Sequence, residues 1–156
     1  MNKEYIHYGH RHFNPNQFIE IENYEWMSTK PKGGLWASSL DAPMSWRWWC
    51  EVEQFPFFSK DRWFKFKLNT NRILYIDNTD VLKNLPDAPN PHGLLTLYWQ
   101  KNLDFVKLKE QYDAIEISLS SCPELYNVLY TWDCDSILIL NKDVIIETES
   151  SEEVNV

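Results

Sequence analysis

The order in which strand and helix patterns follow one another is the feature that most limits how this chain can fold. We expect strands at residues 4–9, 62–68, 72–76, 113–119 and 135–141. We expect helices at residues 41–54, 78–85, 94–101, 104–112 and 123–130. The two kinds of element do not alternate regularly, which argues against a parallel sheet wound with helices on both faces. We therefore predict an α+β fold. It would be a single compact domain with a mixed or antiparallel twisted sheet and flanking short helices.

Two segments carry the clearest strand signals. Residues 62–68 alternate apolar and basic side chains, which is the period of a half-buried strand. Residues 137–140 are all aliphatic, as in a strand covered on both faces, and we expect this strand near the centre of the sheet. The chain contains neither a GxGxxG nor a GxxxxGK[ST] pattern, so the sequence does not indicate a Rossmann or P-loop nucleotide site.

The acidic charge of the chain is concentrated toward its end. The formal net charge is −8, which argues against a protein that grips nucleic acid through its phosphates. Residues 142–156 hold one lysine and five acidic residues, so the rest of the chain is only mildly acidic. We predict a globular domain over residues 1–146 and a disordered acidic tail over residues 147–156.

Cysteine and histidine usage indicates a reduced protein without a metal centre. The three cysteines show no CxxC spacing, and no signal peptide or membrane-length apolar run is recognised, so a cytoplasmic location is expected. His10 and His12 have a spacing that metal sites use. No cysteine or acidic pattern completes a ligand set around them, and we predict no metal.

Glycine is scarce, and three of the four glycines lie in two short segments. The first is His7-Tyr8-Gly9, at the end of the first expected strand. The second runs from Gly33 and Gly34 through Leu35 and Trp36 to Ala37 and Ser38. A glycine lets the backbone turn or approach a ligand closely. The two segments therefore predict a ligand site in which backbone without side chains lies beside a flat aromatic ring.

Together these segments resemble the ADP-ribosyltransferase superfamily. Many members open with a strand ending in His-Gly or Tyr-Gly, followed by a glycine-rich segment that enters a strand with an aromatic residue and a serine. A third signature is an acidic residue at the start of a late strand, where this chain offers Asp133 and Asp135. It departs from the family in having Trp36 in place of the usual tyrosine and aspartate in place of glutamate. The resemblance implies a split sheet.

The resemblance also implies a site for NAD as substrate. His7 or Tyr8 would bind the adenine-side ribose, and a backbone group near Gly9 would hold the nicotinamide amide. Trp36 would stack on the nicotinamide ring. Gly34 and Ser38 would complete this wall. Asp135 or Asp133 would be the catalytic acid that stabilises positive charge developing on the nicotinamide-side ribose.

Two functions follow as alternatives. The first is an NAD-binding ADP-ribosyltransferase-like protein that transfers ADP-ribose to a macromolecular target. The second is a non-enzymatic acidic inhibitor or interaction protein, of phage or mobile-element origin, that blocks a nucleic-acid-binding partner. Interfaces concentrate their binding energy in tryptophan, tyrosine and arginine, and this chain has eight tryptophans and eight tyrosines. Neither function requires direct nucleic-acid binding or a membrane.

Overall fold

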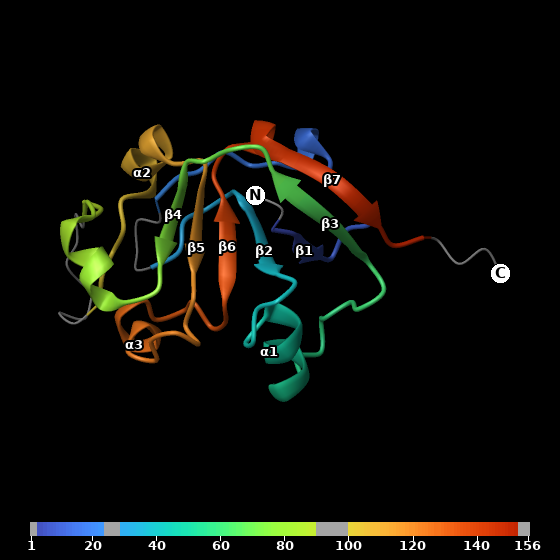
Figure 1. Ribbon diagram of the computed structural model, residues 1–156, viewed down its shortest axis with the longest axis horizontal. Coiled ribbons are helices and arrows are strands. Elements are labelled where there is room, and N and C mark those ends of the chain that lie inside the picture. Colours follow the sequence, from blue (N-terminus) through green and yellow to red (C-terminus); the bar gives the residue numbers. More distant parts are fainter. Residues whose placement is uncertain (1–2, 24–28, 90–99, 153–156) are drawn as a thin grey trace.

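Seven strands form one mixed sheet in the order β4-β5-β6-β2-β1-β3-β7 (Figure 1). The computed structural model describes residues 3–23, 29–89 and 100–152. The strands are β1 (Tyr5–Tyr8), β2 (Leu35–Ser39), β3 (Trp63–Leu68), β4 (Ile73–Ile76), β5 (Ala114–Ile117), β6 (Ser136–Ile139) and β7 (Ile145–Ser150). Only the β4–β5 pair is parallel among these neighbours. The prediction of a single α+β domain with a mixed sheet is confirmed.

The helices of the described residues are short. They are α1 (Trp46–Val52), α2 (Phe105–Gln111) and α3 (Leu125–Val128), with 3₁₀ turns at Pro15–Gln17, Thr79–Asn84 and Lys142–Val144. Figure 1 shows α2 and α3 at opposite ends of β4–β6, and α1 beside the end of β2. None of the helices in these ranges has the length and apolar character needed to cross a bilayer.

The predicted helix over residues 41–54 begins later than expected. Ser45 is the N-cap, since its hydroxyl accepts a hydrogen bond from the Trp48 backbone N–H. The Asp41 carboxylate instead accepts a hydrogen bond from the Ser39 hydroxyl, so it does not cap the helix. The helix expected at 78–85 is a 3₁₀ turn capped by Asn78, and most of the helix expected at 94–101 lies outside the described residues.

The buried hydrophobic residues form two clusters, and both β5 and β6 contribute side chains to each of them. Ile137, Leu138 and Ile139 of β6 are fully buried, because strands flank β6 on both sides and side chains cover both of its faces. The sequence prediction of a buried strand inside the sheet is confirmed. Trp132, just before β6, is the largest fully buried side chain.

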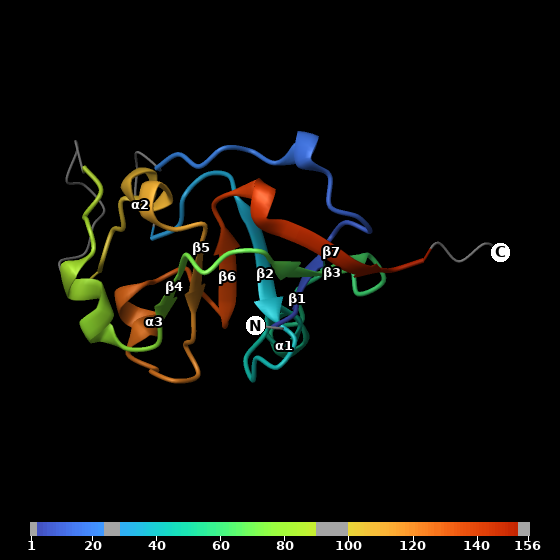
Figure 2. The ribbon, with the colours of Figure 1, turned by 45° about the horizontal axis from the view of Figure 1, so that its top comes forward.

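β2 changes partner along its length. Its first residues pair with β6, with Leu35 opposite Ile139. Its last residues pair with β1, with Ser39 opposite Tyr5 and Ser38 opposite Ile6. The backbone pairing of β1 and β2 does not continue to Tyr8, so the two strands separate beside the first half of β2. Figure 2 shows β1 and β3 leaving the direction of β6 and β2 at an angle.

The predicted disordered tail over residues 147–156 is wrong for its first part. Residues 147–150 belong to β7, which pairs antiparallel with β3 at the edge of the sheet. Glu149 lies opposite Lys65 and accepts a hydrogen bond from its ammonium at 2.8 Å. The carboxylates that make the segment look solvated are therefore the outward residues of an edge strand. Residues 153–156 lie outside the described residues.

Candidate functional site

A cavity of about 330 Å³ lies where β1 and β2 separate. Residues of β1, the segment before β2, β2, the start of α1, and the start of β6 with the segment before it line the cavity: Ile6, His7, Tyr8, Lys30, Trp36, Ala37, Trp46, Asp133, Cys134 and Ser136. The first three come from β1, and Trp36 and Ala37 come from β2. A cavity of this size, mostly apolar with a few polar groups, is typical of a small-molecule site.

His7 closes the gap between the two separating strands with its side chain. Its Nδ1–H donates a hydrogen bond to the Trp36 carbonyl at 2.7 Å. This side-chain bond takes the place of a backbone hydrogen bond between the two strands. Its Nε2 lies 2.9 Å from Nδ1 of His10, and the two rings stack. Burial lowers the pKa of His7, which keeps the imidazole neutral. Within the described ranges, no group of three or more His, Cys, Asp or Glu side chains is arranged to hold a metal ion.

Indole rings form two walls of the cavity. The Trp36 ring meets the buried Trp132 edge to face, with centroids 4.7 Å apart. Trp132 is itself fixed by a hydrogen bond from its Nε1–H to the Thr29 carbonyl. The Trp46 ring stacks on Trp49 at 5.1 Å. Both lining indoles are thus backed by a second aromatic ring, which sets their orientation before any ligand binds.

The cavity also contains one acid and one amine. Asp133 and Lys30 both line it, and the Lys30 ammonium lies 5.3 Å from the centroid of the Trp36 ring. Burial lowers the pKa of Lys30, and the nearby Asp133 carboxylate offsets part of that effect. Burial also raises the pKa of the Cys134 thiol to about 11, so this lining cysteine is protonated and a weak nucleophile.

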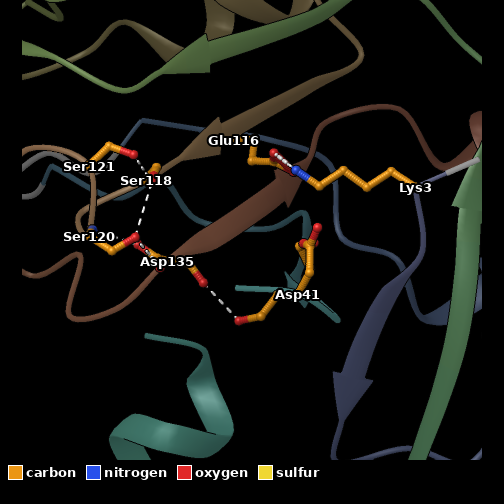
Figure 3. A network of polar contacts seen from close by, with 9 residues as sticks. Lys3, Asp41, Glu116, Ser118, Ser120, Ser121 and Asp135 are labelled. Atoms are coloured by element: carbon orange, nitrogen blue, oxygen red, sulfur yellow. Dashed lines mark hydrogen bonds and ion pairs between the residues drawn. The ribbon is translucent and has the colours of Figure 1, made fainter. Parts of the chain in front are cut away.

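Asp135, the other predicted catalytic acid, does not line this cavity. Its carboxylate accepts hydrogen bonds from the Ser120 N–H at 2.9 Å, the Ser120 hydroxyl at 2.8 Å and the Met44 N–H at 3.1 Å. Figure 3 shows Ser120 beside Asp135, with the Lys3–Glu116 ion pair farther along the same region. The Asp135 side chain is buried. Through these hydrogen bonds its carboxylate connects the loops that contain Ser120 and Met44 to the start of β6.

The remaining predicted site residues support the walls rather than line this cavity. The Ser38 hydroxyl is buried, donates to the Asp135 carbonyl and accepts from the Trp46 N–H. Gly34 has a φ of +75°, and a Cβ there would lie 2.6 Å from Leu138. Gly34 lines a neighbouring hollow of about 190 Å³. Gly9 has a φ of +115°, and its N–H donates to the Arg62 carbonyl.

The structure therefore brings together His7, Tyr8, Trp36 and Asp133 from the predicted set. Sequence reasoning missed Lys30 and Trp46. Lys30 lies three residues before Gly33, and Trp46 belongs to the unusually dense Trp46-Arg47-Trp48-Trp49 run. That density was a usable signal, because one helix face cannot bury three indoles.

Comparison with known proteins gives no relative for this chain: no protein-family model, curated protein or solved structure matches it significantly. The interpretation of the cavity consequently depends on its own geometry and chemistry.

Proposed function

We propose that the cavity binds the nicotinamide end of NAD and that the protein is ADP-ribosyltransferase-like. The observation that carries this proposal is the convergence of His7, Tyr8, Trp36 and Asp133 on one cavity. These are four of the residues that the motif resemblance singled out. They come from β1, β2 and the segment before β6, which are far apart in sequence.

The shape of the cavity supports a flat ring beside a sugar. Trp36 offers an indole on one wall, and Trp46 offers another. Aromatic rings prefer offset stacking, which a nicotinamide ring can make with either indole. The change of partner along β2, from β6 to β1, agrees with a sheet split at the ligand site, as the resemblance implies.

Asp133 is the candidate for the catalytic acid under this proposal. Transfer would break the bond between the nicotinamide nitrogen and ribose C1′ and form a bond from C1′ to the acceptor nucleophile, whose proton is lost. Nicotinamide leaves with the bonding electron pair. Positive charge builds on the ribose ring in the transition state, and a preorganised carboxylate stabilises that charge. Asp133 lines the cavity, whereas the Asp135 carboxylate already accepts three hydrogen bonds.

A surface next to the cavity fits a macromolecular acceptor. Aromatic contacts run from the lining Trp46 to Phe55 at 5.7 Å, and from Phe55 to Phe57 at 5.7 Å. Phe57 is 84% exposed, and Val52 of α1 is 57% exposed. Exposed apolar side chains gathered in one region are typical of binding surfaces. The two ring contacts connect the exposed Phe57 to Trp46 on the cavity wall, so a protein that bound at Phe57 would lie close to the cavity.

Ligand-dependent thermal unfolding tests the binding proposal. Millimolar NAD should raise the Tm of the wild type, because a ligand that binds only the folded state stabilises it. Trp36→Ala should abolish this increase. Trp48→Ala is the matched control, since Trp48 is a partly exposed tryptophan outside the cavity lining, and its response should equal that of the wild type. A wild type without any increase, or a Trp36→Ala variant that responds like the wild type, would refute the assignment.

A further inference from the structure

The backbone turns sharply at Thr131, just before the part of the chain that lines the cavity. Tyr130 is 52% exposed, whereas Trp132 is fully buried and Asp133 lines the cavity. Thr131 has a φ of +90°, in the left-handed region that glycine adopts freely. A β-branched side chain is strongly disfavoured there. Threonine at this position therefore needs a contact that offsets the strain of its backbone.

Thr29 supplies that contact. It is buried, and its hydroxyl donates a hydrogen bond to the Tyr130 carbonyl. A hydroxyl has only one proton to donate, so the Thr29 oxygen accepts the 2.9 Å hydrogen bond from the Thr131 hydroxyl. The Thr29 carbonyl accepts another hydrogen bond, from Nε1–H of Trp132 at 2.7 Å. Thr29 therefore holds three consecutive residues of the segment before β6.

These hydrogen bonds lie directly behind one wall of the cavity. The Trp132 ring meets the Trp36 ring edge to face, with centroids 4.7 Å apart, and Trp36 lines the cavity. Trp132 is fully buried and is not itself a lining residue. Because aromatic rings in contact have preferred relative orientations, the position of Trp132 decides how Trp36 faces the cavity. The pair of threonines thus acts on the wall through Trp132.

We propose that Thr131 is a positioning residue for the cavity. Its left-handed backbone directs Trp132 into the core, and its hydroxyl ties this turn to Thr29. The Trp36 indole is thereby held in one orientation before a flat ligand ring stacks on it, which lowers the cost of ordering the site on binding. The inference rests on the proposed function only for the identity of the ligand, since the contacts that carry it lie within the protein.

Fluorine NMR of protein labelled with 5-fluorotryptophan reports on the Trp36 ring directly, and Trp36→Phe assigns its resonance. Thr131→Gly removes both the strain and the hydroxyl, Thr131→Val removes the hydroxyl alone, and Thr131→Ser keeps the hydroxyl. Gln54→Gly is the matched control. Gln54 is the other non-glycine residue with a positive φ in the described ranges, at +53°, and it is exposed just after α1.

Thr131→Gly and Thr131→Val should shift or broaden the Trp36 resonance and weaken NAD binding. If the released ring spends about a tenth of its time in the binding orientation, the Kd for NAD rises about tenfold. Thr131→Gly should keep its Tm within about 3 °C of the wild type, because relief of strain offsets the lost hydrogen bond. Thr131→Val should lower Tm by about 2–6 °C. Thr131→Ser and Gln54→Gly should keep the wild-type resonance and affinity.

Weakened binding at a nearly unchanged Tm separates positioning from general stability. The inference would be overturned by an unchanged Trp36 resonance in Thr131→Gly and Thr131→Val, or by wild-type NAD affinity in both variants. If Thr131→Gly does not fold, Thr131→Val decides the question, since it keeps the wild-type side-chain shape. A Trp36 resonance that responds as expected in a protein that binds no NAD would count against the proposed function alone.

Discussion

Replacing each of the two neighbouring aspartates separately should separate stability from ligand binding. Asp135 is 5% exposed, and its carboxylate accepts three hydrogen bonds from Ser120 and Met44. Asp133 lines the cavity and is only half-buried. The substitutions Asp135→Asn and Asp133→Asn are nearly isosteric and remove the same charge. Asp135→Asn should nevertheless lower stability and keep the NAD response, whereas Asp133→Asn should keep stability and lose the NAD response.

The cost of Asp135→Asn follows from its three donors. Asparagine turns one carboxylate oxygen into an NH₂ group, so at least one of the two backbone N–H donors, Ser120 or Met44, loses its acceptor. A buried donor left without a partner costs about 1–3 kcal/mol, and the remaining bonds lose their charge. We expect a loss of about 2–3 kcal/mol in the free energy of unfolding, or about 4–12 °C in Tm for a chain of this length. Asp133→Asn should change stability by less than about 1 kcal/mol.

Urea unfolding followed by circular dichroism gives the free energies, and the NAD-dependent increase in Tm gives the ligand response. Asp135→Asn should be less stable yet respond to NAD at temperatures where it is folded. Asp133→Asn should be as stable as the wild type and lose the NAD-dependent increase in Tm. The reasoning would be refuted by a fully stable Asp135→Asn variant that has lost the NAD response, accompanied by an unaffected Asp133→Asn variant. In that case Asp135 would be the acid that meets the ligand.

Three further predictions concern other parts of the structure. Burial lowers the pKa of His7 in the folded state below its ordinary value of about 6.5. The neutral His7 side chain therefore contributes its full stability above about pH 6.5, and this contribution is lost as the pH falls from there through the lowered pKa of the folded state. His7→Asn, whose amide N–H can also reach the Trp36 carbonyl, should therefore lose less stability than the wild type between about pH 6.5 and 5 in urea titrations, and equal losses would contradict the assignment. Gly34→Ala should lower the free energy of unfolding by about 2–5 kcal/mol, because the positive φ strains any side chain and the new Cβ would lie 2.6 Å from Leu138. Gly9→Ala should lower it by only about 1–2 kcal/mol, because the nearest atom to a Cβ there is 3.9 Å away. Similar losses for the two variants in urea unfolding would refute the packing argument. Phe57→Ser should leave Tm and NAD binding unchanged, since the side chain is 84% exposed, but should lower transfer to a protein acceptor in a labelled-NAD assay; undiminished transfer would remove this surface from the acceptor site.

The sequence predicted the strands best where burial leaves a periodic mark. The alternation over residues 62–68 and the aliphatic run at 137–140 became β3 and β6, because side-chain orientation along a strand decides which residues are covered. The helix start at Asp41 was misplaced, since that carboxylate accepts the Ser39 hydroxyl and Ser45 caps the helix. Which of two plausible caps is used depends on tertiary contacts that local sequence does not contain.

The sequence predicted only part of the candidate site, because the position of its side chains also depends on tertiary contacts. Trp36 and Asp133 were identified, yet Asp135 lies two residues from Asp133, and its carboxylate belongs to a different hydrogen-bonded network. Side chains two apart on an extended segment share a face in principle, but the chain before β6 is not a regular strand. Lys30 entered the cavity only because the segment before β2 folds against the segment before β6, a contact between residues about a hundred positions apart.

The carboxylates of β7 have a role that composition alone would miss. β7 is the last strand of the sheet, and its residues 146–149 are exposed. An outer strand offers unpaired backbone groups to any other extended chain, and outward charges discourage such pairing. Glu147 and Glu149 would bring like charges together if two copies met edge to edge. We expect a chain with both residues neutralised to self-associate through this strand more readily than the wild type at high concentration.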